Sequence, residues 1–352
     1  MIEDKKVLFL FNLSMDLDNP ILATTNLWAN EFAKHFEHVY VYSTHVGRHE
    51  VPKNVKVTEL GGGSLGMRII AVAKLSVAFL SIMKLRRRSI VFHHQSPFTS
   101  VFPGLILHIT GIRQGLWYSH SSKPISLVLG AKFVDRIFSS SPASLPLSSE
   151  KANFFGHGID TVRAKQSLEQ STGKRSGILY IGRISPIKKL EECINAIVVA
   201  EREELFFLAI GPTDSKNEYL NYLLKLAKNQ KVNFRRELPI DHELVFERMA
   251  QSNMFFAGMR NSVDKSCLEA AVSGCFVITN DQASADLSGM SHFWQEINGK
   301  TGLPELSDQI RIIVSANPQI LEKYRLDVSS KAADLNSVTK LVGRISSKLK
   351  EI

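Results

Sequence analysis

Short apolar runs alternate with helical segments along almost the whole chain of 352 residues, and this alternation restricts the possible folds more than any other feature. In the first half, helical patterns at 22–36 and 65–85 separate strand-like runs at 6–11, 39–42, 55–58, 90–92 and 116–118. Strands that alternate with helices predict a parallel sheet with helices on both faces.

The alternation restarts after a polar stretch of low hydrophobicity at 161–176, which is the best linker candidate. We therefore expect an α/β chain of two Rossmann-like, doubly wound domains, at 1–160 and 177–334, that face a central cleft. A last helix at about 335–352 could pack back on the first domain. Ligands of such sheets bind beyond the carboxyl ends of the strands, so function is expected in the loops that follow strands.

The compartment is predicted from the cysteines and from the apolar runs. The chain has three cysteines, Cys193, Cys267 and Cys275, too few for a disulfide framework. Its N-terminus lacks the basic region and longer apolar core of a signal peptide. No apolar run reaches the roughly 20 residues that span a bilayer. These features predict a soluble, cytoplasmic protein.

Charge is unevenly distributed in this chain of net charge +9. Between Glu59 and Asp135 there are no acidic residues but many basic ones, including the end of the predicted helix at 65–85, with Lys84 and 86–88. An acid-free basic region suggests an anionic partner: membrane lipid, a phosphorylated acceptor or nucleic acid. Alternatively, the arginines are solvated and the helix packs its apolar face on the sheet.

The first motif that indicates chemistry is YIGRISPIKK at 180–189. A predicted strand ends at Gly182, and Arg183 and Lys188 follow before the next helix. Two fixed cations beside a helix N-terminus form a diphosphate site, because the helix end is partly positive and its N–H groups donate to phosphate oxygens. A solvated turn with incidental basic residues is the alternative.

The second motif lies at 259–274, MRNSVDKSCLEAAVSG, between two predicted strands. Asp264 is placed as an acid at the N-terminus of the helix, and Glu269 is flanked by small and apolar residues. A lone carboxylate there must be paired or functional, because burying it unpaired is costly. Glu269 could accept hydrogen bonds from ribose hydroxyls, or it could form a salt bridge with Lys265 four residues earlier.

Together these segments resemble the retaining GT-B glycosyltransferases of family four, over nearly the whole chain. YIGRISPIKKLEECINAI resembles that family's strand–GR–x4–K–helix donor signature, and FFGHGIDT at 154–161 its interdomain turn. DKSCLEAAVSGCFVITN resembles the second half of its E-x7-E motif and the strand that follows, and LWYSHSS at 116–122 its strand-end histidine. Asn261 departs from the pattern, because the first glutamate of E-x7-E is expected at its position.

The resemblance implies a role for each matching position. The first domain would be the acceptor side and the second would bind the nucleotide sugar. His120, Arg183 and Lys188 would be catalytic: His120 would face the transferred sugar, while the two cations would bind the donor diphosphate. Glu269 would hold the ribose, and Gly182 would let the donor approach the backbone. The further donor-binding candidates are Asn261, Asp264 and Lys265, and the acceptor-side candidates are Asp18, Asn19, His94 and His120.

The function expected from the resemblance is transfer of a sugar, of the hexosyltransferase kind, from a nucleotide-diphosphate sugar with retention of configuration. The acceptor would be a glycan or a lipid-linked molecule, in the synthesis of cell-surface polysaccharide or glycolipid, and the protein could be peripheral at the inner face of the membrane. No metal or other cofactor is expected, since protein cations and helix dipoles serve the diphosphate. A GT-B phosphorylase or epimerase, and a non-catalytic nucleotide- or nucleic-acid-binding α/β protein, remain alternatives. No phosphate-binding loop, dinucleotide fingerprint or helix-turn-helix motif supports the non-catalytic nucleotide- or nucleic-acid-binding alternative.

Overall fold

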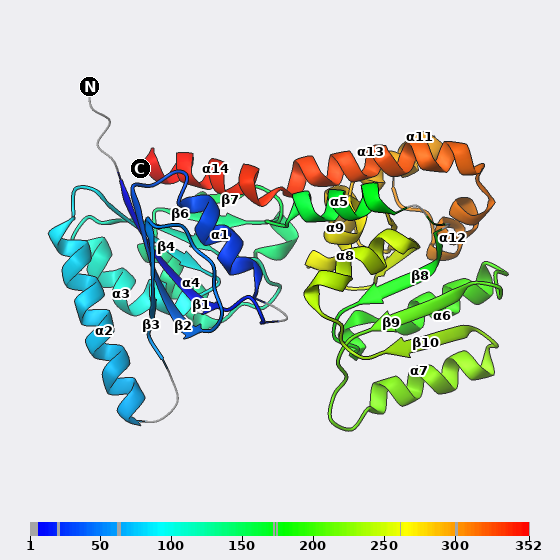
Figure 1. Cartoon of the computed structure of the whole chain (residues 1–352), viewed down its shortest axis with the longest axis horizontal. Coiled ribbons are helices and arrows are strands. Elements are labelled where there is room, and N and C mark those ends of the chain that lie inside the picture. The colour runs from blue at the N-terminus through cyan, green and yellow to red at the C-terminus, as the bar shows by residue number, and fades with distance from the viewer. Residues whose placement is uncertain are drawn as a thin grey trace. The chain divides into compact units, whose positions relative to one another are not determined.

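The structure, a computed structural model, describes residues 6–19, 22–61, 65–171, 173, 175–260, 262–299 and 302–351. The chain forms two compact units, one of Met1–Gly158 with Val338–Ile352 and the other of Ile159–Ser337. Each unit is built on a parallel sheet covered by helices (Figure 1). The predicted α/β class is confirmed.

The first unit contains a seven-stranded sheet in the order β3-β2-β1-β4-β5-β6-β7. Its elements are β1 (Val7–Met15), α1 (Thr24–Phe32), β2 (His38–Val46), β3 (Val55–Glu59), α2 (Leu65–Lys84), β4 (Ser89–His94), α3 (Pro97–Ile109), β5 (Arg113–Trp117), α4 (Ile125–Phe133), β6 (Arg136–Ser139), the short 3-10 helix η1 (Pro142–Ser144), β7 (Ala152–Phe154) and α14 (Val338–Lys350).

The central strand β1 is buried on both faces, as its continuous apolar sequence requires. Successive side chains of a strand point to opposite faces. Leu8 and Leu10 therefore pack in a core with α1 and α14, while Phe9 and Phe11 pack in a second core with α2 and α3. This arrangement fixes α2 and α3 on one side of the sheet and α1 and α14 on the other.

The C-terminal helix α14 is part of the first unit, although it follows the second unit in the sequence. Its apolar side, with Leu341, Val342, Ile345 and Leu349, joins the core beside α1. Burying a large apolar side chain contributes about 1.5–3 kcal/mol, and this burial keeps the helix on the first sheet.

The second unit contains a five-stranded sheet in the order β10-β9-β8-β11-β12. Its elements are α5 (Thr161–Gln170), β8 (Ser176–Ile181), the 3-10 helix η2 (Pro186–Lys188), α6 (Leu190–Val199), β9 (Phe206–Ile210), α7 (Glu218–Asn229), β10 (Asn233–Glu237), α8 (His242–Gln251), β11 (Ser252–Ala257), α9 (Lys265–Val272), β12 (Phe276–Thr279), α10 (Gln282–Leu287), α11 (Met290–Asn298), α12 (Leu306–Ser315) and α13 (Pro318–Asn336).

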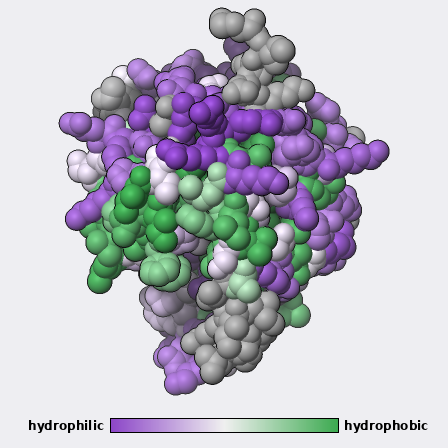
Figure 2. All heavy atoms as spheres, turned by 90° about the vertical axis from the view of Figure 1, so that its left-hand side faces the viewer, coloured by the Kyte–Doolittle hydropathy of each residue, from purple (hydrophilic) through white to green (hydrophobic). Residues whose placement is uncertain are grey.

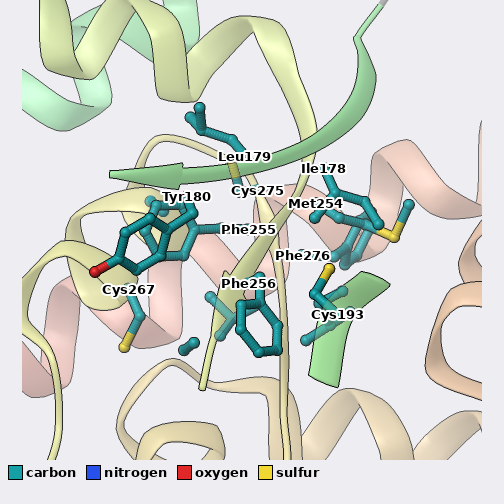
Figure 3. Packing of buried hydrophobic residues seen from close by; sticks show 14 of the residues in the cluster. Ile178, Leu179, Tyr180, Cys193, Met254, Phe255, Phe256, Cys267, Cys275 and Phe276 are labelled. Carbon is teal, nitrogen blue, oxygen red and sulfur yellow. The ribbon is translucent and has the colours of Figure 1, made fainter. Parts of the chain in front are cut away.

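The core of this unit is built from its strands and the helices that follow them, with Tyr180, Phe255 and Phe256 among its largest buried side chains (Figure 3). The three cysteines are free and buried in it. Burial raises the pKa of the Cys275 thiol to about 12. The cysteines therefore act as small apolar core residues.

Most of the linker candidate at 161–176 forms helix α5. Asp160 occupies the N-cap and accepts a hydrogen bond from the backbone N–H of Arg163 at 3.0 Å. The sequence of this helix has little apolar periodicity, and only Ala164 is buried. A local capping bond and packing against α8 and α9 therefore form a helix that composition alone did not predict.

The boundaries between the units also differ from the predicted ones. The first unit ends at Gly158 and resumes at Val338, whereas the sequence suggested residues 160 and about 335. Among the described residues, no helix is long and apolar enough to cross a membrane.

Candidate functional site

Most of the predicted donor-side residues lie at one edge of the second sheet, where β8 and β11 end. The strand order places β8 beside β11, although β9 and β10 lie between them in the sequence. The connections from these two strands therefore leave toward opposite sides, which makes this edge a topological switch point. Ligands of open α/β sheets bind at such points. The loop at 182–189 meets residues 258–260 and 262–264 here.

An ion pair joins these two loops. Lys188 Nζ lies 2.5 Å from Asp264 Oδ1 and 3.2 Å from Met259 Sδ. The exposed fractions of the two charged side chains are 17% and 19%, so both are partly removed from solvent. An ammonium group has three N–H donors, and these contacts leave one for a further acceptor.

Asp264 occupies the N-cap of α9, where an acid was predicted, but its side chain makes no capping hydrogen bond. Its carboxylate accepts from Lys188 instead. The structure thus gives Asp264 a second role, which is to hold the lysine ammonium beside the first turn of α9.

The backbones of two loops approach each other closely at Gly182 and Gly211. The Gly182 N–H donates to Ile210 O at 3.0 Å. A Cβ at Gly211 would lie 2.0 Å from Gly182 O, and one at Gly182 would lie 2.8 Å from the Tyr180 hydroxyl. Both glycines have positive φ, of 152° and 149°. Gly182 is therefore required by the packing of the loop itself, independently of any ligand.

Arg183 is exposed in the loop that follows β8. Its backbone carbonyl accepts a hydrogen bond from the Tyr180 hydroxyl at 2.8 Å. Burial raises the pKa of that hydroxyl, so it remains a donor. The loop is thus fixed through its backbone, while the guanidinium projects to solvent.

The N-terminus of α6 differs from the expectation of free N–H groups for phosphate. Glu191 and Glu192 occupy its first turn, and the Leu190 N–H donates to the Tyr219 hydroxyl at 2.8 Å. Acids in the first turn already complement the positive end of a helix. The cations, more than this helix end, would attract an anion here.

Glu269 forms the salt bridge that was left open as its alternative role. Its Oε1 lies 3.3 Å from Lys265 Nζ, one turn earlier on α9. Glu269 is buried, while the lysine side chain is 26% exposed. A carboxylate has about four acceptor sites, so pairing with Lys265 fixes its orientation without using all of them.

A charged cluster around Glu192 was not predicted. The Glu192 carboxylate accepts from Arg260 at 3.0 and 3.2 Å and from Asn280 Nδ2 at 3.1 Å, and Lys189 Nζ lies 3.4 Å away. It connects the loops after β8, β11 and β12. The only signs of this cluster in the sequence are Glu192, an acid at the start of a helix, and Arg260, an arginine beside Asn261. Asn261 itself lies outside the described residues.

In the first unit, His120 follows β5 and is exposed. Its ring Nδ1 accepts a hydrogen bond from the backbone N–H of Ser122 at 2.9 Å, and the backbone N–H of His120 donates to Ser144 O at 2.9 Å. Because Nδ1 accepts, the neutral ring carries its proton on Nε2. The loop therefore presents Nε2–H as a donor at the carboxyl edge of the sheet.

His93 and His94 end β4, the neighbour of β5. His93 is fully buried, contacts Thr99 Oγ1 at 2.8 Å and Gln114 Oε1 at 3.3 Å, and has its pKa lowered to about 4 by burial. This is a structural histidine. His94 is also buried, with its ring 4.5 Å from that of Trp28.

Asp18 and Asn19 lie after β1, which is adjacent to β4 in the sheet. Arg48 Nη2 donates to Asp18 Oδ1 at 2.7 Å, and this hydrogen bond lowers the pKa of the carboxyl. Asn19 Oδ1 accepts from the Leu22 N–H at 2.8 Å. The side chains of Asp18 and Asn19 are thus both engaged in hydrogen bonds with protein groups. They lie at the same sheet edge as His94 and His120.

A polar cluster next to His120 was also not predicted. Ser119 Oγ lies 2.6 Å from Ser140 Oγ and 3.4 Å from His157 Nε2. Gln95, with a positive φ of 53°, donates from its backbone to Trp117 O. These residues are far apart in the sequence, so only the fold brings them together. In the described part of the chain, no group of three or more His, Cys, Asp or Glu could hold a metal ion.

Solved structures share this architecture over the full length of the chain. HepE of Anabaena, solved with UDP and with UDP and glucose, aligns with TM-score 0.70 at 15% and 16% identity, covering 99% of this chain and 100% of that one. Sucrose-phosphate synthase from Thermosynechococcus elongatus aligns with TM-score 0.70 at 13% identity, with the same coverage. The chain has the GT-B fold.

WaaG, a glycosyltransferase involved in lipopolysaccharide biosynthesis, aligns on the same GT-B fold with TM-score 0.57 at 14% identity, covering 97% of this chain and 99% of that one. No family model and no curated protein matches the sequence of this GT-B chain. Within its second unit, the structure brings Lys188 to Asp264 and Lys265 to Glu269, and leaves Arg183 exposed.

Proposed function

We propose that the protein is a glycosyltransferase that takes a sugar from a uridine-diphosphate sugar. The observation that carries the proposal is the Lys188–Asp264 pair at the switch point of the second sheet, with Arg183 exposed in the same loop. HepE, which shares the fold, was solved with UDP and with UDP-glucose. These HepE structures support a uridine-diphosphate sugar as the donor.

The binding step follows from the charges at this edge. Asp264 holds the Lys188 ammonium in place and leaves it one N–H donor for a phosphate oxygen. Arg183 supplies a planar, permanently charged guanidinium that can donate two parallel hydrogen bonds to the diphosphate. Glu269, oriented by Lys265, would accept from the ribose hydroxyls.

The transfer step requires stabilisation of the charge that develops on the departing nucleotide. As the bond between the anomeric carbon and the phosphate oxygen breaks, negative charge grows on the diphosphate. Fixed cations stabilise that charge more strongly in the transition state than in the bound donor. Arg183 and Lys188 would supply this stabilisation, and His120 would donate from Nε2 to the transferred sugar.

The finer parts of the proposal are retention of configuration and the acceptor. The acceptor would be a glycan or a lipid-linked molecule, in the synthesis of cell-surface polysaccharide or glycolipid, with the protein at the inner face of the membrane. WaaG, which shares the fold, acts in lipopolysaccharide biosynthesis. Retention rests on the motif at 180–189 and the helix around Glu269.

Calorimetric titration with UDP, followed by a UDP-release assay with UDP-glucose, tests the donor. We expect saturable UDP binding and slow release of UDP from the sugar nucleotide even without acceptor. The anomeric configuration of the released or transferred sugar, read by NMR, tests retention. Absence of UDP binding would refute the uridine donor, and absence of binding to every nucleoside diphosphate would refute the glycosyltransferase assignment.

A further inference from the structure

Large apolar side chains are exposed together on two helices of the first unit. On α3, Phe98, Phe102 and Ile109 are 71%, 75% and 75% exposed, and on α4 Ile125 is 78% exposed. Leu129, on the next turn of α4, is also exposed. An isolated exposed apolar residue is ordinary, but a contiguous set of this size marks an interaction surface.

The two helices pack tightly enough to form one surface. A Cβ at Gly130 of α4 would lie 2.0 Å from Ser100 Oγ of α3, so the helices meet at this glycine. Phe98, Phe102 and Ile109 follow each other at intervals of four and seven residues and therefore line one side of α3. We call this surface the α3–α4 face; its residues are Phe98, Phe102, Leu105, Ile109, Ile125 and Leu129.

Helix α2 extends the apolar surface on the same side of the sheet. Its Ala78 and Ile82 are buried in the core that also contains Leu107 of α3, while Val77 and Leu80 are 62% and 67% exposed. The sequence suggested that α2 either packs on the sheet or rests on a membrane. The structure shows that Ala78 and Ile82 of α2 pack in the core on the sheet, and that α3 and α4 also carry exposed apolar side chains.

Figure 2 shows the left-hand side of Figure 1, with hydrophobic residues gathered in a broad band across the middle and hydrophilic residues above it. This band lies on the side of the first unit that carries α2 and α3 (Figure 1).

The segment that forms α2, α3 and α4 carries only positive charges. No acidic residue occurs between Glu59 and Asp135, a segment that includes α2, α3 and α4. Lys132 lies one turn beyond Leu129 on α4, and Lys123 lies just before that helix; both are exposed. At the end of α2, the side chains of Lys84 and of 86–87 are exposed as well.

Charge complementarity selects the occupant of this face. A symmetric dimer would bring two copies of the same surface together, and the segment offers no carboxylate to pair with the facing lysines and arginines. An anionic bilayer supplies both an apolar layer for the aromatic and aliphatic side chains and negative headgroups for the cations.

We infer that the α3–α4 face binds the surface of an anionic lipid bilayer, with its apolar side chains in the acyl boundary and the surrounding cations at the headgroups. The inference rests on the proposed function only in that it would bring the enzyme to a lipid-linked acceptor. Bilayer binding requires no nucleotide, so its failure and a failure to bind UDP are separate results.

Flotation with lipid vesicles tests the inference, using the full chain without nucleotide. Vesicles of phosphatidylcholine with phosphatidylglycerol are compared with vesicles of phosphatidylcholine alone, at low and high salt. We expect flotation with the anionic vesicles at low salt and a weaker partition at high salt, since salt screens the headgroup attraction. No flotation with anionic vesicles at low salt overturns the inference.

Paired variants locate the binding surface. Phe98→Ser with Phe102→Ser should lower the partition coefficient about tenfold or more, because two large apolar side chains are lost from the bilayer. The matched control, Leu224→Ser with Leu326→Ser, changes two exposed leucines of the second unit and should float as the wild type does. Equal flotation of the phenylalanine variant and the wild type overturns the inference.

A second pair of variants tests the charges without touching the apolar residues. Arg86→Ser with Lys123→Ser should weaken binding to anionic vesicles and leave partition onto phosphatidylcholine unchanged, whereas Lys225→Ser with Lys228→Ser, on α7, should leave both unchanged.

The competing occupant of this face is a second copy of the chain, and size-exclusion chromatography with light scattering tests it by measuring the oligomeric state. A dimer that the phenylalanine variant converts to monomer would mean that a second copy covers this face, and would overturn the inference.

Discussion

Lys188 Nζ and Asp264 Oδ1 lie 2.5 Å apart and connect the loop after β8 to the first turn of the helix after β11. The two strands are neighbours in the sheet but are separated by two others in the sequence. The ion pair therefore positions a cation at the switch point before any ligand arrives. A preorganised donor loses less entropy on binding than a mobile one.

Lys188→Ala should weaken UDP binding about ten- to a hundredfold, because a charge-assisted hydrogen bond contributes roughly 1.5–3 kcal/mol. It also leaves the Asp264 carboxylate without its partner and so adds repulsion toward the diphosphate. Calorimetric titration measures the affinity, and Lys225→Ala, on the exposed side of α7, serves as the control. UDP affinity equal to that of the wild type would remove Lys188 from the donor site.

Arg183→Ala should also weaken UDP binding by about tenfold or more, while the melting temperature stays within error, because the guanidinium is exposed and only its backbone carbonyl holds the loop. Arg183→Lys keeps the charge but loses the planar pair of donors, so it should recover only part of the affinity. Full recovery by lysine would indicate a general electrostatic attraction instead of a directed contact.

Glu269→Gln separates two roles of the same carboxylate. If Glu269 binds ribose, the affinities for UDP and for UDP-glucose should fall by similar factors, roughly tenfold, because the contact does not involve the sugar. If it serves only Lys265, the melting temperature should shift slightly and both affinities should remain. Lys265→Ala provides the comparison, since it removes the salt bridge but keeps the carboxylate.

Much of the fold could be predicted because strand and helix periodicity are local properties. The runs that became β1, β8 and β11 are continuous and apolar, as strands buried on both faces must be. The motif at 180–189 and the helix around Glu269 were placed correctly after strands for the same reason. The contacts of Glu192 with Arg260 and Asn280 span 68 and 88 residues, and no local pattern encodes them.

Two of the helices that sequence reasoning missed, α3 and α5, have patterns that do not match a half-buried helix. Helix α3 contains Pro103 and is apolar on its exposed side as well as its buried side, so it lacks the polar face that identifies an amphipathic helix. Helix α5 has the opposite composition, with one buried residue. Contacts that no local pattern encodes accompany both helices: α3 packs against α4 and β5, and α5 packs against α8 and α9.

The buried imidazole of His93 makes the stability of the first unit dependent on pH. Its pKa is about 4 in the folded protein and about 6.5 in an unfolded chain. Below pH 6.5 the unfolded chain therefore binds a proton that the folded protein does not. Stability is complete above pH 6.5 and falls by ~3 kcal/mol as the pH approaches 4.

Thermal unfolding between pH 7 and 5 should show about 2 kcal/mol of this loss, and His93→Gln should reduce it, because glutamine can keep a hydrogen bond but does not titrate. His38→Gln, at an exposed position, is the control and should keep the dependence of the wild type. The same pH dependence in His93→Gln would assign it to other groups.

His120→Ala should lower the turnover of the sugar nucleotide about a hundredfold, the effect of removing one donor that acts on charge in the transition state. UDP affinity should change little, because His120 belongs to the first unit and the predicted diphosphate contacts belong to the second. Steady-state UDP release gives the turnover and calorimetry gives the affinity. Since the imidazole is exposed and accepts one bond from the Ser122 N–H, the melting temperature should fall by only a small amount. Equal losses of turnover and affinity, or a large drop in melting temperature, would mean that His120 supports the loop and does not contact the sugar.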